Sequence, residues 1–96
     1  MKDDKASQIC IVTIIGQDKV GIVARLANAM SRANINILDI NQNVMEEHFV
    51  MTMAVDVTHA TIDMGQIKKK LDRIGREMAL KITVQDEKIF KAMHRV

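Results

Sequence analysis

A short polar loop with a glycine at each end is the stretch of this sequence whose residue types could do chemistry. Segment 16–21 reads Gly-Gln-Asp-Lys-Val-Gly and separates an apolar run, 9–15, from a helical pattern that starts at Ile22. Where such a loop joins a strand to a helix, backbone N–H groups converge and can bind an anion. The loop is therefore the best candidate for a binding site on this chain.

An α-amino acid is a ligand whose chemistry fits this loop. Its carboxylate needs donors, which the backbone N–H groups of Gly21, Ile22 and Val23 at a helix N-terminus can supply. Its ammonium needs acceptors, and Asp18 or the side-chain oxygen of Asn36 can supply those. The same residues also have an ordinary structural explanation, because Asp18 and Asn36 can brace turns and glycines permit positive φ.

Length and composition limit the class of protein. The chain has 96 residues, enough for one globular domain, and its 14 basic and 12 acidic side chains are mostly interspersed. A net charge of +2 indicates no strong attraction to nucleic acid or to an anionic membrane. No apolar stretch approaches the ~20 residues of a membrane span, and the acidic start is unlike a secretion signal. We expect a cytoplasmic protein.

Hydrophobic periodicity predicts four strands around which the loop must be built. Segments 9–15 and 49–57 are apolar on both alternating sets, which is typical of central strands covered on two faces. Segment 36–45 mixes apolar and polar side chains and is expected at a sheet edge. A half-buried last strand begins at Leu80. The single cysteine, Cys10, lies inside the first strand and is interpreted as a small buried hydrophobe.

Three helices complete the pattern. The first runs from Ile22 to Ala33, and the second from Met64 to about Glu77 after a capping box formed by Asp63 and Gln66. A short terminal helix follows Asp86, which can cap it. The three consecutive lysines of the second helix are interpreted as a solvated helix face: Lys68, Lys69 and Lys70.

The order β-α-β-β-α-β with a terminal helix matches the split βαβ, ferredoxin-like α+β plan. That plan is a four-stranded antiparallel sheet with both main helices on one face. We therefore divide the chain into a loose tail, 1–7, a domain, 8–85, and a C-terminal helix, 86–96.

The other face of this sheet should carry four to six unburied aliphatic side chains. At about 1.5–3 kcal/mol each they represent roughly 6–18 kcal/mol, comparable to the ~5–15 kcal/mol stability of a small domain. We therefore predict a homodimer in which Ile89, Phe90 and Met93 are buried against the sheet or a partner chain. Coverage of the face by the terminal helix within one chain is the alternative.

Three segments carry a resemblance to a known family. Ile-Gly-Gln-Asp-Lys-Val-Gly-Ile-Val-Ala (15–24), Ala-Asn-Ile-Asn-Ile-Leu-Asp-Ile-Asn-Gln (33–42) and Ile-Phe-Lys-Ala-Met-His (89–94) resemble the small stand-alone ACT-domain proteins. The sequence is also similar to ACT modules of the glycine cleavage repressor and of formyltetrahydrofolate deformylase.

This resemblance implies a regulatory, non-catalytic fold, without a cofactor, that senses amino acids or similar small metabolites at a dimer interface. Many ACT domains have proline where this chain has Val20, so the loop is expected to be more flexible than theirs. The resemblance implies a pocket lined by Gly16, Asp18, Lys19, Gly21, Ile22, Val23, Asn36, Ile37 and Leu38.

Other function classes fit the residues less well. An acylphosphatase-like enzyme needs an arginine in the first loop, which offers only Lys19. An RNA-recognition sheet needs exposed aromatics on its central strands, whereas the chain has two aromatic residues, Phe49 and Phe90. The spacing of the histidines indicates neither a metal site nor a catalytic dyad: His48, His59 and His94.

The sequence thus predicts a homodimeric regulatory domain that binds a small amino-acid-like metabolite between the first loop of one subunit and the second strand of a neighbour. Binding would order the loop, and a partner protein could respond to the change. The alternative is an interaction module that dimerises or docks on an enzyme or regulator without binding a metabolite. Neither the metabolite nor the partner is identified by the sequence.

Overall fold

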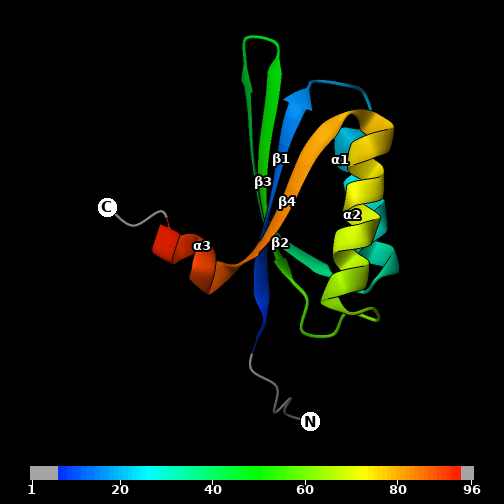
Figure 1. The fold of residues 1–96 in the computed structure, drawn as a ribbon, viewed down its shortest axis with the longest axis vertical. Coiled ribbons are helices and arrows are strands. Elements are labelled where there is room, and N and C mark those ends of the chain that lie inside the picture. Colours follow the sequence, from blue (N-terminus) through cyan, green and yellow to red (C-terminus); the bar gives the residue numbers. More distant parts are fainter. Residues whose placement is uncertain (1–6, 94–96) are drawn as a thin grey trace.

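The structure, a computed structural model that describes residues 7–93, confirms the predicted ferredoxin-like α+β fold (Figure 1). Among these residues no helix is both long and apolar enough to span a bilayer. Most of the predicted tail 1–7, and the last three residues, lie outside the described part. The elements are β1 (Ile9–Gln17), α1 (Ile22–Arg32), β2 (Asn36–Met45), β3 (His48–Asp56), α2 (Met64–Met78), β4 (Leu80–Asp86) and α3 (Glu87–Met93).

The four strands form one sheet in the order β2-β3-β1-β4, with every neighbouring pair antiparallel. β1 and β3 are central, as predicted from their apolar sequences, and β2 lies at an edge. The pairing of β2 with β3 is irregular between Ile37 and Asp39, so Leu38 lies at a bulge.

The core lies between the sheet and the two main helices. In Figure 1, α1 and α2 cover the same face of the sheet. α1 contributes the buried stripe Ile22, Leu26 and Met30, and these side chains have helical spacing. β1 and β3 contribute every second residue, because side chains of a strand alternate between faces. The largest fully buried side chains of these strands are Val12, Ile14, Phe49, Met51 and Met53.

Local hydrogen bonds explain where the helices begin. The N–H of Gln66 donates to Asp63 Oδ1 at 2.8 Å, and the N–H of Asp63 donates to Gln66 Oε1 at 3.0 Å. This confirms the predicted capping box of α2. At α3, the N–H of Lys88 donates to Asp86 Oδ1 at 2.8 Å, so Asp86 caps that helix as expected.

The face of the sheet opposite α1 and α2 is less apolar than predicted. A polar row crosses all four strands, because Thr13 pairs with Thr83 and Thr52, and Thr52 pairs with Asn41. Only Ile15, 42% exposed, is strongly exposed among the aliphatic residues of β1 and β3 on this face. Together with Ile15, the half-buried Ile9, Val50 and Ala54 make four aliphatic side chains on this face that are not fully buried, at the lower end of the predicted four to six, but three of the four are only partly exposed.

α3 explains part of this difference. It lies on the opposite side of the sheet from α1 and α2 (Figure 1) and contacts β1 and β4. Ile11 on the same face is only 9% exposed. The exposed aliphatic side chains lie instead on the edge strand and on α3 itself. They include Leu38, Ile40, Val44, Ile89 and Met93.

Candidate functional site

The predicted loop joins β1 to α1 and leaves donors at the start of the helix. Gly21 is the N-cap residue of α1, with φ 91°, and no side chain caps this helix. In an α-helix the first N–H groups have no partner within the helix, so those of Ile22 and Val23 can donate to a bound group. The side chain of Ile22 is buried in the core, whereas Val23 and Asp18 are exposed.

Two of the predicted loop residues have contacts within the fold. A Cβ added at Gly16 would lie 2.6 Å from Leu80 Cδ2 and 3.2 Å from the carbonyl oxygen of Ala79, so glycine is needed for close packing there. Lys19 Nζ donates to the carbonyl oxygen of Met78 at 2.7 Å. A cation at the C-terminus of a helix is favourable, so Lys19 fastens the loop to α2.

Asn36 and Ile37 line a groove at the other end of the sheet. The groove has a volume of about 670 Å³ and is formed by the end of α1, the start of β2 and the end of β3. Leu38, although predicted, does not line it. Of its lining residues, only Asn36 and Ile37 were predicted from the sequence. The full lining comprises Ala27, Ser31, Asn34, Ile35, Asn36, Ile37, Asp56 and His59.

Asp56 makes this groove a place for a positively charged group. Its Oδ1 accepts hydrogen bonds from the hydroxyl and from the backbone N–H of Thr58, the latter at 2.9 Å. Both hydrogen bonds, and the one from the hydroxyl most of all, hold the pKa of the Asp56 carboxyl below its ordinary value. The carboxyl is therefore ionised at neutral pH. Asn34 supports the groove, because its Nδ2 donates to the carbonyl oxygen of His59 at 3.0 Å.

The two halves of the predicted pocket do not meet within one chain. Asn36 is in register with Asp56 and Asp56 with Ile9, at the start of β1. Gly16 is in register with Phe49, at the other end of β1. With about 3.3 Å of rise per residue, the two ends lie roughly 23 Å apart along the strand. A pocket made of both halves needs a second subunit.

Nucleophilic or metal chemistry finds little support in the described residues. Among residues 7–93, no group of three or more His, Cys, Asp or Glu side chains is placed to hold a metal ion. Cys10 is buried, and loss of solvation raises the pKa of its thiol. A buried thiol of raised pKa is unreactive, because the thiolate is the nucleophile.

A four-stranded antiparallel sheet with two helices on one face and a strand-loop-helix connection defines the class as a ferredoxin-like α+β domain. The chain belongs to the ACT domain family, whose family model matches residues 8–85. This confirms the resemblance seen in the sequence.

Curated relatives match over nearly their whole length. A UPF0237 protein from Methanocaldococcus jannaschii is 44% identical over 86 residues, covering 90% of this chain and 96% of that protein. A UPF0237 protein from Clostridium acetobutylicum is 42% identical over 86 residues, covering 90% of this chain and 97% of that protein.

Solved structures agree with this assignment. An ACT domain protein from Streptococcus pneumoniae is 31% identical with a TM-score of 0.76, covering 93% of this chain and all (100%) of that one. A formyltetrahydrofolate deformylase from Pseudomonas syringae shares the fold at 19% identity and a TM-score of 0.76, covering 86% of this chain and 28% of that one. A candidate glycine cleavage system transcriptional repressor shares it at 18% identity and a TM-score of 0.74, covering 85% of this chain and 47% of that one.

Proposed function

We propose that this ACT domain protein is a regulatory homodimer that binds a small amino-acid-like metabolite between the β1–α1 loop of one subunit and the start of β2 in its neighbour. The observation that carries the proposal is the separation of two complementary half-sites. The loop offers backbone donors suited to a carboxylate, and the groove offers the Asp56 carboxylate and the Asn36 side chain as acceptors for an ammonium.

A two-fold arrangement through the edge strand would unite these half-sites. Val44 is in register with Phe49 and therefore lies at the level of Gly16. If two β2 strands pair antiparallel about a two-fold axis, the Asn36 end of one faces the Val44 end of the other. The loop of each subunit then lies at the same level as the groove of its neighbour.

The chemistry of β2 supports such a contact. An edge strand presents unpaired backbone N–H and C=O groups that can pair with another chain. On β2, Leu38, Ile40 and Val44 are 51%, 41% and 53% exposed, so pairing would also remove aliphatic surface from water. The single chain buries none of Ile89, Phe90 and Met93 against the sheet, since Ile89 and Met93 are 54% and 65% exposed and Phe90 is half-buried. Their burial against a partner stays a prediction.

These exposed side chains equally favour a second function. An interaction module that dimerises, or docks on an enzyme or regulator, would use Leu38, Ile40 and Val44 without any metabolite. The two functions differ in whether the loop and the groove bind a ligand.

Calorimetric titration with the twenty amino acids tests the proposal. Gly21→Ala perturbs the donor half and Asn36→Ala the acceptor half, and each should abolish the heat given by any active amino acid. Asn43→Ala is the matched control, because Asn43 is an exposed asparagine on the same strand at the opposite end. Light scattering on each variant would show whether the dimer persists.

Mixing the two inactive variants tests the shared pocket. A heterodimer of Gly21→Ala and Asn36→Ala subunits has one pocket with both changes and one intact pocket. Random exchange should thus restore about a quarter of the sites. Absence of restored binding in a verified heterodimer would place both residues in one subunit's site and contradict the proposal. If no amino acid gives heat with the unmodified protein, the interaction module is favoured.

A further inference from the structure

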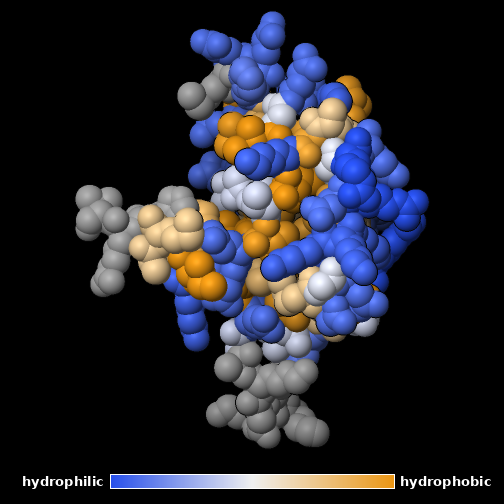
Figure 2. All heavy atoms as spheres, in the orientation of Figure 1, coloured by the Kyte–Doolittle hydropathy of each residue, from blue (hydrophilic) through white to orange (hydrophobic). Residues whose placement is uncertain are grey.

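A basic groove lies on the outer surface of the helical layer, between α1 and α2. It has a volume of about 310 Å³, and its lining includes four cationic side chains and no acidic one. Figure 2 shows this side of the molecule, over α1 and α2, as strongly hydrophilic. The groove is lined by Arg25, Asn28, Ala29, Arg32, Lys70, Arg73 and Ile74.

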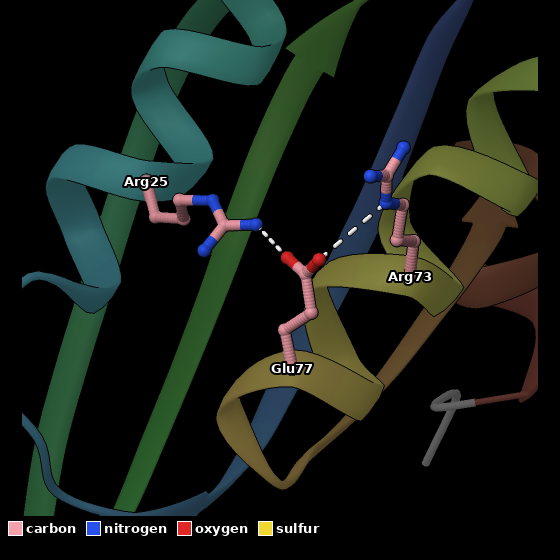
Figure 3. A network of polar contacts seen from close by, with 3 residues as sticks. All are labelled: Arg25, Arg73 and Glu77. Atoms are coloured by element: carbon pink, nitrogen blue, oxygen red, sulfur yellow. Dashed lines mark hydrogen bonds and ion pairs between the residues drawn. The ribbon is translucent and has the colours of Figure 1, made fainter.

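One end of this groove already holds a carboxylate of the chain itself. Glu77 lies between Arg25 of α1 and Arg73 of α2 (Figure 3). Arg25 pairs with one oxygen of Glu77, and Arg73 Nε lies 3.4 Å from the other. Arg25 is the main reason that the pKa of the Glu77 carboxyl lies below its ordinary value. The two helices together are therefore able to bind a carboxylate.

The other end of the groove has the same geometry, but a lysine stands where the first end has the glutamate. Arg32 lies seven residues after Arg25 on α1, and Lys70 lies seven residues before Glu77 on α2. Seven residues are close to two helical turns, so both residues return to the same faces about 10 Å along the groove. Where Glu77 faces Arg25 at one end, Lys70 and Arg32 line the other end without a carboxylate.

We propose that this groove docks an acidic segment of a partner protein, with a carboxylate of the partner lying between Arg32 and Lys70 as Glu77 lies near Arg25. Two cations lining one groove repel each other, and a carboxylate between them turns that repulsion into attraction. The lysine that sequence analysis assigned to a solvated face, Lys70, is thereby part of a recognition surface.

The observations favour an acidic protein segment over other anions. The groove is bordered by exposed side chains, with Arg73 75% exposed, which suits a segment lying across the surface better than an enclosed small molecule. Single-stranded nucleic acids are usually bound with stacked aromatics, but Phe49 is buried in the core and Phe90 lies on α3, across the sheet. An arginine fork also matches a carboxylate in geometry.

Charge reversal at Lys70 tests the proposal with a fluorescein-labelled octaglutamate peptide as probe. Binding is followed by fluorescence anisotropy at 50 mM NaCl, and the site is mapped by amide shifts in NMR spectra. The unmodified protein should shift amides in 25–32 and 69–77. Lys70→Glu places a carboxylate opposite Arg32 and should weaken binding about tenfold. The matched control, Lys69→Glu, has the same charge change at an exposed neighbour that does not line the groove, and should weaken binding about twofold.

Each other outcome contradicts the docking site. Equal losses in Lys70→Glu and Lys69→Glu would mean attraction by net charge alone. Absence of binding at low salt would remove the site altogether. Tighter binding of sodium tripolyphosphate or of oligouridylate to the same residues would assign the groove to a phosphate ligand or to RNA. Because the metabolite titration uses Gly21 and Asn36, its failure leaves this result unaffected.

Discussion

The two ends of the sheet offer half-sites of opposite chemistry and opposite construction. At the loop end, Gly16 and Lys19 are held by the turn between α2 and β4, and the donors are backbone groups. At the groove end, Asp56 and Asn36 project functional side chains from the strands into an open groove. In the proposed site, residues at the loop end therefore serve folding as well as binding, whereas residues at the groove end can change with less effect on stability.

The largest effect is expected where the loop end is most tightly packed. Gly16→Ala should lower the free energy of unfolding by about 2 kcal/mol, because the new methyl group overlaps Leu80 Cδ2 and presses on the Ala79 carbonyl. Urea denaturation measures this loss. In a Leu80→Ala background the same change should cost less, since the nearest atom is gone. Additive losses would show that the close approach does not matter.

A smaller effect is expected at the glycine that starts α1. A Cβ at Gly21 meets nothing within 4 Å, so Gly21→Ala should cost only the strain of its φ of 91°, about 1 kcal/mol. Gly21→Asn should cost less, since asparagine tolerates the left-handed region better. Urea midpoints of the three proteins give the order, and a larger loss in the asparagine variant would reveal a packing constraint instead of strain.

At the groove end, the Asp56 carboxyl should make the free energy of unfolding depend on pH. The folded pKa of Asp56 lies below its ordinary 3.8, so the unfolded chain binds this proton more readily. The stabilisation it contributes is complete above about pH 4 and is lost as the pH falls through the lower folded value. Because Asp56 is only half-buried and solvent screens its carboxyl, we expect less than about 1 kcal/mol.

Thr58→Val tests this effect, because it removes the hydroxyl donor to Asp56 and keeps the backbone one, while it also removes the acceptor of the Gln8 N–H. The pKa of Asp56, followed by NMR titration of its carboxyl carbon, should rise. The urea midpoint should then fall less steeply as the pH is lowered below about 4, and Asp56→Asn should reduce this fall further. Thr61→Val is the matched control at an exposed threonine nearby, and an equal change there would contradict the assignment.

The smallest effect concerns the fastening of the loop to α2. Lys19→Met removes the hydrogen bond to the Met78 carbonyl and should cost about 0.3 kcal/mol at low salt. Lys69→Met on the exposed face of the same helix should be neutral. The difference should shrink at 1 M NaCl, where the Debye length is about 3 Å. A loss that is independent of salt would indicate packing of the lysine stem.

Most of the fold could be predicted from the sequence because its signals are local. The capping box places the start of α2 within one turn of chain, and the bounds of β2 follow from its own mixed pattern. The apolar character of β1 and β3 sets them at the centre. The open face was harder to predict, because only the register shows that Thr13, Thr52 and Thr83 form one row.

The candidate site was predicted in part for the same reason. Its loop is one continuous segment, so the glycines and the helix start are visible in the sequence. The groove is assembled from α1, β2 and β3, and Asp56 and His59 enter it only through tertiary structure. An acidic residue two positions before a threonine at a strand end, as in Asp56 and Thr58, was the one local signal that could have indicated an ionised group.

The contacts between the first loop and the end of α2 also determine which part of the fold would respond first to ligand binding. Gly16 lies against Ala79 and Leu80, and Lys19 donates to the carbonyl of Met78, so the loop contacts the corner where α2 passes into β4 at two points. A ligand that rigidifies the loop would therefore affect that corner first, although two strands, β1 and β3, separate β4 from the edge strand β2 that would pair with a second subunit. The exchange rates of the amide protons in the last turn of α2 should therefore report ligand binding, and hydrogen exchange measures them without a label on either molecule.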